Sequence, residues 1–189
     1  YKVAESWGIF EDVLCAGNEE IYPFLEGVFD EVIELFPSQF IHVGGDECPK
    51  TRWEKCPKCQ GKIKDLGLKS DAKHTAEQKL QSYVIQRIEK YINSKGRQII
   101  GWDEILEGGI APNATIMSWQ GIEGGIEAAH QGHNSIMTPT SFLYFDYYQA
   151  LDIKDEVFGI GGYVPVERVY SFEPMPEALS AEKQKYIIG

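Results

Sequence analysis

The strongest constraint on the fold is the order in which helical and strand-like patterns follow one another. Apolar residues recur at helical spacing in residues 18–38 and again in residues 75–96. Apolar runs of strand length follow, and one more helix candidate lies among them; the runs are 39–45, 97–102, 114–119 and 134–140, and the helix candidate is 124–132. Parallel neighbouring strands need a crossover, which is usually helical, so this order predicts an α/β fold with a parallel sheet.

Residues typical of helix ends place the boundaries of the two longer helices. Asn18 is the expected N-cap of the first helix and Thr75 that of the second, which Gly96 ends. The link 103–113 contains Gly and Pro, so we expect no full crossover helix there. Residues 147–176, rich in Gly, Pro and aromatic side chains, predict a long irregular excursion. The first helix carries an apolar stripe of Ile21, Leu25, Val28, Phe29, Val32 and Leu35.

Composition limits the class of protein. The chain has 189 residues, of which 43% are hydrophobic, enough for one globular core. Its formal charge of −11 excludes the basic surface that a nucleic-acid partner needs. No apolar stretch approaches the roughly 20 residues of a membrane span. The N-terminal residues match no signal peptide and include no initiator Met, so we expect the chain to be part of a longer protein.

The cysteines leave two interpretations open. Cys48, Cys56 and Cys59 are three conceivable zinc ligands, with His74 as a fourth. A second Cys-x-x-Cys pair is absent, however, and free thiols or one disulfide in a pinned loop explain the residues as well. We therefore predict no metal ion and no other cofactor, and we expect Cys15 to pack by itself.

Two adjacent carboxylates, Asp46 and Glu47, end the first predicted strand. Neighbouring carboxylates repel each other, which costs stability unless solvent, a counter-ion or a chemical role separates their protonation states. A solvated turn is the simplest explanation. Successive side chains of a strand point to opposite faces, so both carboxylates can reach one site only if the backbone bends there. Gly44 and Gly45 make such a bend inexpensive.

The other predicted strands also end in aromatic or acidic residues. Trp102 and Trp119 end the second and third strands, and Tyr144 and Asp146 follow the fourth. In parallel α/β folds the ligand binds at the carboxyl ends of the strands. A tryptophan ring suits the C–H face of a sugar, and acids accept hydrogen bonds from its hydroxyls. Each tryptophan alone fits core packing equally well, but the repetition favours a sugar site.

Four segments, in this order, resemble the catalytic barrel of family 20 glycoside hydrolases, the β-N-acetylhexosaminidases of bacterial type. They are HVGGDE (42–47), GWDE (101–104), SWQG (118–121) and YFDYYQ (144–149). The resemblance covers nearly the whole chain. It implies a (β/α)8 TIM-barrel fold, of which this chain covers roughly strands 4 to 7. Residues 1–189 would then be a partial catalytic domain that lacks the first three strands and the last.

The resemblance implies an activity: hydrolysis of terminal GlcNAc or GalNAc residues from β-N-acetylhexosaminides. Family 20 enzymes use the 2-acetamido group of the substrate as the nucleophile, with retention of configuration. By this resemblance Glu47 would protonate the leaving oxygen and then activate water, while Asp46 would hold the acetamido N–H and stabilise the developing positive charge. Residues 1–189 alone would have little or no activity.

Five further positions correspond to the sugar-binding residues of that family. Trp102 and Trp119 resemble the aromatic walls around the acetamido group and the sugar face. Tyr144 resembles the tyrosine that holds the acetamido oxygen, and Asp146 the acid that binds a sugar hydroxyl. His42 resembles a histidine behind the catalytic pair, although a core histidine with satisfied hydrogen bonds fits the sequence as well.

Two other functions remain open from the sequence. A carbohydrate-binding module without turnover would use the aromatic residues but not the carboxylate pair, and a small interaction module would use the cysteines to bind zinc. The resemblance implies glycans containing N-acetylhexosamine as partners. It also favours export of the parent protein to the periplasm, the cell surface or the medium. A partial barrel leaves strand edges unpaired, so we expect residues 1–189 either to associate with a second copy or to be one ordered portion of a larger polypeptide.

Overall fold

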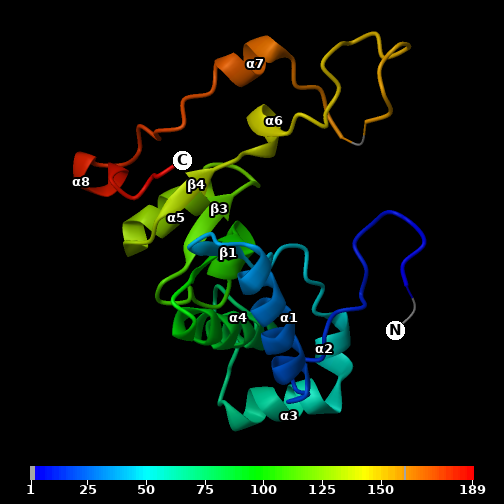
Figure 1. Cartoon of the computed structure of the whole chain (residues 1–189), viewed down its shortest axis with the longest axis vertical. Helices are drawn as coiled ribbons and strands as arrows, with labels where there is room; N and C mark the ends of the chain where they lie inside the picture. Colours follow the sequence, from blue (N-terminus) through cyan, green and yellow to red (C-terminus); the bar gives the residue numbers. More distant parts are fainter. Residues whose placement is uncertain (1–2, 160) are drawn as a thin grey trace. The chain divides into compact units, whose positions relative to one another are not determined.

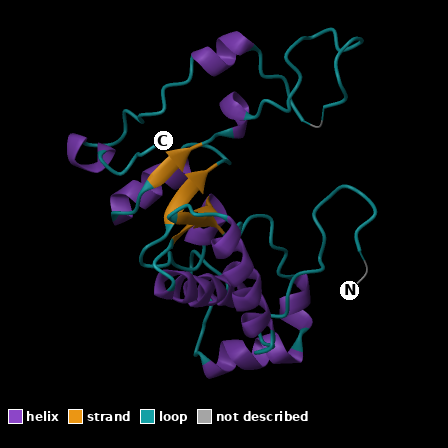
Figure 2. Ribbon diagram, viewed as in Figure 1, coloured by secondary structure: helices purple, strands orange, loops and turns teal. Residues whose placement is uncertain are grey.

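The chain divides into two compact units, Tyr1–Ala114 and Thr115–Gly189. A computed structural model describes residues 3–159 and 161–189. Figure 1 traces the elements along the chain, and Figure 2 distinguishes helices, strands and loops. Each unit contains one pair of parallel strands, as the alternating sequence pattern predicted.

The first unit holds two strands with helices between them. Its elements are α1 (Ile21–Leu35), β1 (Phe40–His42), α2 (Thr51–Lys55), α3 (Pro57–Asp65), α4 (Ala76–Ser94), β2 (Gln98–Trp102) and the 3₁₀ turn η1 (Asp103–Leu106). β1 and β2 are parallel, with Ile41 opposite Ile99. α4 packs against β2 and against α1, so it is the helical crossover between the strands.

The two longer helices, α1 and α4, lie where the sequence predicted them, but only α4 has the predicted N-cap residue. Thr75 caps α4 in a capping box: its hydroxyl accepts the Gln78 N–H at 3.2 Å, and the Gln78 side chain accepts the Thr75 N–H at 2.8 Å. The prediction of Asn18 as the cap of α1 is wrong. Glu20 holds that position, with helical backbone angles and no side-chain cap, because backbone bonds such as Ile21 N–H to the Asn18 carbonyl already form the first turn.

The core of the first unit lies where α1 and α4 meet the strands. Tyr22, Leu80, Ile92 and Ile99 are fully buried. The Tyr22 hydroxyl donates to the Ala16 carbonyl at 2.9 Å, which ties the segment before α1 to this core. Only part of the predicted stripe of α1 is covered: Ile21 is buried, whereas Leu35 is 72% exposed. The helix is thus amphipathic, but the packing concentrates at its first turn.

The second unit repeats the strand–helix–strand pattern. Its elements are β3 (Thr115–Ser118), α5 (Glu123–Gln131), β4 (Ser135–Met137), α6 (Thr140–Leu143), α7 (Val166–Tyr170) and α8 (Ala181–Gln184). β3 and β4 are parallel, with Met117 opposite Ile136. A side chain at Gly125 would lie 2.5 Å from the Met137 methyl carbon, so a glycine is needed where α5 approaches β4.

Two of the connecting segments are as the sequence predicted, and a third contains two helices that were not predicted. The segment 103–113 forms only the η1 turn, and the long segment 147–176 contains only the short α7 among its described residues. α2 and α3 were not predicted, because both are short and Cys56 between them is extended. In the described part of the chain, no helix has the length and apolar character of a membrane span.

Candidate active site

The backbone after β1 bends sharply before it reaches the two carboxylates. Gly44 and Gly45 have φ of +70° and +98°. The Gly44 carbonyl still accepts the Trp102 N–H at 3.0 Å, so the pairing with β2 continues up to the bend. A side chain at Gly45 would lie 2.3 Å from a methyl carbon of Ile105, which is itself 1% exposed. The bend therefore needs glycine for both its angles and its packing.

Asp46 and Glu47 follow this bend on an exposed segment. Glu47 has φ of +45°, the only positive value for a non-glycine residue in the part of the chain that the structure describes. Such a left-handed conformation costs about 1–2 kcal/mol for an ordinary residue and is common near functional sites. With this backbone conformation, the Glu47 side chain does not follow the alternating side-chain directions of a strand. Asp46, in addition, lines a mostly apolar cavity of about 260 Å³ together with Leu25 and Ile85.

His42 and Trp102 lie side by side at the ends of β1 and β2. Their ring centroids are 4.9 Å apart, in an edge-to-face arrangement at 61°. The Gly44 N–H donates to His42 Nδ1 at 3.1 Å, so this nitrogen is an acceptor and the neutral ring carries its proton on Nε2. Partial desolvation lowers the pKa of His42, and the Asp46 carboxylate opposes that shift. In residues 1–189 His42 is exposed, with its ring against Trp102, and its place behind the catalytic pair stays a prediction.

Gln81 of α4 supports the bend and was not predicted from the sequence. Its side-chain amide donates to the Gly45 carbonyl at 2.7 Å, and the residue is only 4% exposed. This bond fixes the peptide group that precedes Asp46. A buried Gln on the apolar face of an amphipathic helix was the available signal, because buried polar groups need a partner.

The predicted residues of the second unit gather around a set of aromatic rings. Trp119 follows β3, and its ring stacks on that of Tyr144 with centroids 6.2 Å apart and planes at 20°. Tyr144 also meets Tyr147 edge-to-face at 5.9 Å. Trp119 and Tyr144 are half-buried, whereas Asp146 is exposed and lines a cavity of about 570 Å³ within residues 145–159. Trp119 thus belongs to an aromatic wall rather than to a fully buried core.

The predicted site residues therefore fall into one group in each unit. The first unit brings His42 and Trp102 together and places Asp46 and Glu47 just beyond them. The second unit brings Trp119 and Tyr144 together, and Asp146 lies two residues further on.

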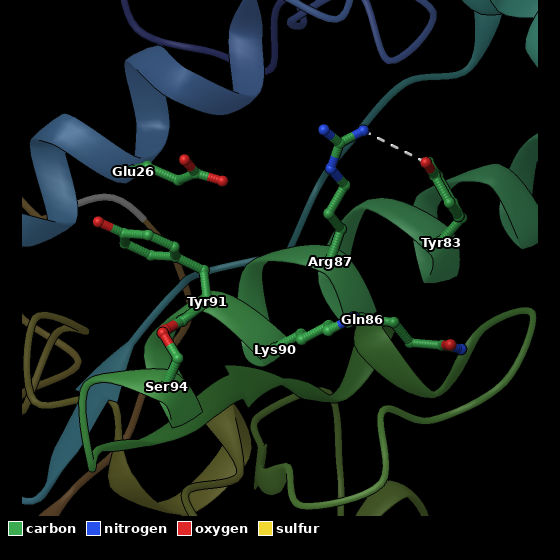
Figure 3. A pocket seen from close by; sticks show the side chains of 7 residues that line it. All are labelled: Glu26, Tyr83, Gln86, Arg87, Lys90, Tyr91 and Ser94. Carbon is green, nitrogen blue, oxygen red and sulfur yellow. Dashed lines mark hydrogen bonds between the residues drawn. The ribbon is translucent and has the colours of Figure 1, made fainter.

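One further cavity, in the first unit, is lined by none of the predicted site residues. It has a volume of about 570 Å³ and is lined by Glu26 of α1 and by α4 side chains between Tyr83 and Ser94. Figure 3 shows these side chains, with Arg87 donating to the Tyr83 hydroxyl at 3.3 Å. Polar and charged groups on an open helix surface explain this hollow, so we do not assign the candidate site to it.

The cysteines group differently from the prediction. The described residues contain one set of three potential metal ligands, Cys15, Cys56 and Cys59, whose sulfurs lie within 4.8 Å of one another. Cys15 therefore does not pack by itself, because its loop lies against the start of α3. The sequence suggested Cys48 together with Cys56 and Cys59, and Cys48 is the wrong member of these three because Cys15 takes its place. His74, the suggested fourth ligand, is also outside the set. All four cysteines are free thiols.

Comparison with known sequences gives one consistent result. Over residues 1–189 the chain matches the profile of "Glycosyl hydrolase family 20, catalytic domain". A β-hexosaminidase of Porphyromonas gingivalis is 50% identical over 190 residues, which are 100% of this chain and 24% of that protein. A β-hexosaminidase of Vibrio furnissii is 33% identical over 181 residues, 95% of this chain and 29% of that protein. The chain thus spans about a quarter of the length of these curated relatives.

Solved structures agree. A Flavobacterium johnsoniae chitobiase superposes with a TM-score of 0.81 at 28% identity, over 100% of this chain and 27% of that one. An exo-β-N-acetylglucosaminidase of Vibrio harveyi, solved in complex with N-acetylglucosamine, gives 0.78 at 28% identity over 93% of this chain and 27% of that one. The fold is accordingly α/β of the (β/α)8 TIM-barrel type, and this chain covers roughly strands 4 to 7 of it.

Proposed function

Because the chain belongs to glycosyl hydrolase family 20, we propose that the complete protein is a retaining β-N-acetylhexosaminidase that removes terminal GlcNAc or GalNAc from glycans. The relatives that match over most of this chain are named β-hexosaminidases. A carbohydrate-binding module without turnover is not favoured, since it would have no use for adjacent carboxylates on a strained turn. A zinc-bound interaction module does not account for the family match.

The bend that carries Asp46 and Glu47 is the observation that supports this reaction best. A retaining glycosidase with a protein nucleophile places two carboxyl groups about 5 Å apart on opposite sides of the scissile bond. Consecutive residues are poorly suited to straddle a bond in that way. The positive φ of Gly44, Gly45 and Glu47 instead takes the backbone out of the extended conformation, so the two carboxylates need not point to opposite faces as successive strand residues do. One acid and one stabilising carboxylate, with a nucleophile from the substrate, fit this arrangement.

The proposed reaction has two steps. First, the acetamido carbonyl oxygen attacks the anomeric carbon, the glycosidic C–O bond breaks, and Glu47 gives its proton to the leaving oxygen. Asp46 accepts a hydrogen bond from the acetamido N–H and stabilises the positive charge of the oxazolinium ring. Second, water attacks the anomeric carbon while the Glu47 carboxylate takes its proton. The ring opens, and the sugar is released with its original β configuration.

Substitutions in the complete enzyme test these two roles separately. Glu47→Gln should lower kcat by roughly 10²–10⁴ for substrates with poor leaving groups, because the proton donor is lost. It should retain much more activity on dinitrophenyl N-acetylglucosaminide, whose leaving group needs no proton. Asp46→Asn should lower kcat by roughly 10²–10³ on both substrates, because charge stabilisation is needed in each case.

Glu34→Gln is the matched control, because this exposed carboxylate lies on α1 away from the bend. It should leave both activities unchanged, and circular dichroism should show that all three variants are folded. Equal losses of kcat/KM for Glu47→Gln on both substrates would contradict its role as an acid, because this constant reports the first step and not the water attack that both substrates share. A glycosyl ester trapped on Asp46 or Glu47 would contradict the substrate-assisted mechanism altogether.

Two features of the wider proposal concern partners and location. The glycans that carry terminal N-acetylhexosamine are the proposed substrates, and Trp102, Trp119 and Tyr144 offer ring faces to such sugars. We also propose that the parent protein is exported, since polymeric glycans are found mainly outside the cytoplasm. Fractionation of cells that express the complete gene, with the activity assayed in each fraction, tests the location.

A further inference from the structure

Three cysteine sulfurs meet at the junction between the segment before α1 and the start of α3. Cys15 Sγ lies 3.6 Å from Cys56 Sγ and 3.6 Å from Cys59 Sγ. Thiolates bound to one tetrahedral zinc ion at about 2.3 Å are about 3.8 Å from each other. Two of the three sulfur–sulfur distances are therefore already close to that spacing, and the third, between Cys56 and Cys59, is within 4.8 Å, although 41 residues of sequence separate Cys15 from Cys56.

Close backbone contact holds this arrangement. A side chain at Gly17 would lie 2.1 Å from the Lys58 carbonyl oxygen and 2.5 Å from the Cys59 nitrogen. The loop that carries Cys15 thus rests directly on the Cys-Pro-Lys-Cys turn, and only glycine permits this approach. The Trp53 indole N–H donates to the Leu14 carbonyl at 2.9 Å, which is a second attachment of the same loop.

The start of α3 favours negatively charged sulfur ligands, whereas burial opposes them. Cys56 and Cys59 occupy the N-cap position and first turn of the nine-residue helix α3, where free N–H groups and the helix dipole favour thiolates. Backbone N–H groups, that of Cys59 first, lower the pKa of the Cys56 thiol, but burial raises the pKa of the Cys59 thiol to about 12 against the effect of the Gly17 backbone N–H, so a bound ion has to displace the Cys59 proton.

We propose that Cys15, Cys56 and Cys59 bind one zinc ion as thiolates. Three soft sulfur ligands in a tetrahedral arrangement select zinc over magnesium, calcium or manganese. The fourth position opens toward a cavity of about 340 Å³ that Glu11, Arg52 and Lys55 also line. Water or the Glu11 carboxylate completes the site, and Lys55 offsets its net negative charge, since Arg52 already pairs with Asp12 at 2.6 Å.

A disulfide is the competing chemistry, and it fits less well. It would join two of the three sulfurs and leave the third as a buried or half-buried thiol with no partner of its own. Cys15 lies at the same distance from both of its neighbours, so the geometry favours neither pairing. One ion uses all three sulfurs at once.

The proposed ion would stabilise the segment that follows the candidate catalytic residues. Glu47 is joined to α3 through a connection that includes only the five-residue helix α2. A metal bond from the start of α3 to the loop before α1 closes this connection at its far end. The proposal depends on the cysteine geometry alone and stands whether or not the enzymatic reaction is as proposed.

Metal analysis of the complete protein, purified without a polyhistidine tag, tests the proposal. We expect one zinc per chain in the wild type and loss of zinc in Cys15→Ser and Cys59→Ser. Cys48→Ser is the matched control, because this cysteine lies outside the group and should leave the zinc content unchanged. Removal of zinc by a chelator should lower Tm by several degrees, and added zinc should restore it.

A second measurement covers variants that fail to fold. Stripped wild-type protein loaded with Co²⁺ should show the sulfur-to-metal charge-transfer and visible bands of a tetrahedral thiolate site. Four free thiols with no uptake of zinc or Co²⁺ would overturn the proposal. So would an intact mass two hydrogens lower, with Cys15 linked to Cys56 or Cys59. Iron or copper in place of zinc would overturn the assignment of the ion.

Discussion

The segment after β1 is fixed by main-chain and core contacts, whereas the segment after β4 is held mainly by aromatic rings. After β1, Gly45 fits against buried Ile105, and Gln81 binds its carbonyl. After β4, Tyr144 lies between the rings of Trp119 and Tyr147 at centroid distances of about 6 Å. The later part of that segment is joined by the bond from Tyr148 N–H to the Gly162 carbonyl at 3.1 Å.

This difference matches the demands of the roles proposed for the two segments. Proton transfer and charge stabilisation lose efficiency when a carboxylate moves by a fraction of an ångström, so a rigid backbone is needed there. A ring that packs against a sugar tolerates small shifts, because its contact is broad and weakly directional. The comparison predicts that packing changes after β1 damage the enzyme more than equivalent changes after β4.

The largest effect is expected from Gly45→Ala, compared with Gly161→Ala. Both glycines have positive φ, and at each a new side chain would lie 2.3 Å from its nearest neighbour. At Gly45 that neighbour is buried Ile105, so strain and overpacking should cost about 2–4 kcal/mol. Thermal unfolding and kcat of the complete enzyme measure the result, and kcat should fall at least about 100-fold.

Gly161→Ala should cost less, because its neighbour is the half-buried ring of Tyr147, which can shift. We expect about 1–2 kcal/mol of destabilisation and a change in KM rather than in kcat. Gly27→Ala on α1 is the control: its new side chain meets nothing within 4 Å, and it should stabilise the helix slightly. Equal damage at positions 45 and 161 would refute the contrast between the two segments.

A smaller effect is expected from the aromatic wall of the second unit. Trp119→Ala removes the ring that stacks on Tyr144 and should raise KM about 10- to 100-fold, because an aromatic contact with the sugar is lost. Tyr144→Phe keeps the stacked ring but removes its hydroxyl. If that hydroxyl holds the acetamido oxygen in the reaction, Tyr144→Phe should lower kcat more than it raises KM. Initial rates over a range of substrate concentration separate the two constants, and an unchanged kcat in Tyr144→Phe would remove its proposed role.

Local sequence patterns predicted the elements whose causes are local. The hydrophobic period placed α4, and Thr75 is its N-cap as predicted; the reciprocal bond from Gln78 was not predicted. Gly44 and Gly45 indicated the bend because the required backbone angles exclude most other residues. The aromatic residues at the strand ends were also recognisable from local sequence, because each lies next to an apolar run.

Contacts between distant segments were not predictable in this way. Cys15 meets Cys56 and Cys59 only because Gly17 lets two backbones touch, and no spacing rule connects residues so far apart. Gln81 supports Gly45 across 36 residues, and its partner could not be inferred from the helix pattern. Asn18 failed as a cap because backbone bonds at 18–22 had already satisfied the first turn.

The smallest effect should appear in the pH dependence of the segment after β1. Desolvation lowers the pKa of His42 in the folded protein, so the folded state resists protonation more than the unfolded state does. As pH falls through the ordinary histidine pKa of about 6.5, the unfolded chain takes up a proton first. Stability is therefore lost between that pH and the lower pKa of the folded state, and it is constant above.

His42→Asn sharpens this prediction, because the Asn side-chain oxygen can accept the Gly44 N–H that His42 Nδ1 now accepts, but it does not titrate. Tm of the wild type should fall more steeply than that of His42→Asn between pH 7 and about pH 5, whereas the two curves should run parallel above pH 7. His130→Asn, an exposed position on α5, serves as the control and should follow the wild type. Identical slopes for wild type and His42→Asn would mean that protonation of His42 does not disturb the bend, and that the main-chain contacts of Gly44 and Gly45 alone keep it in place.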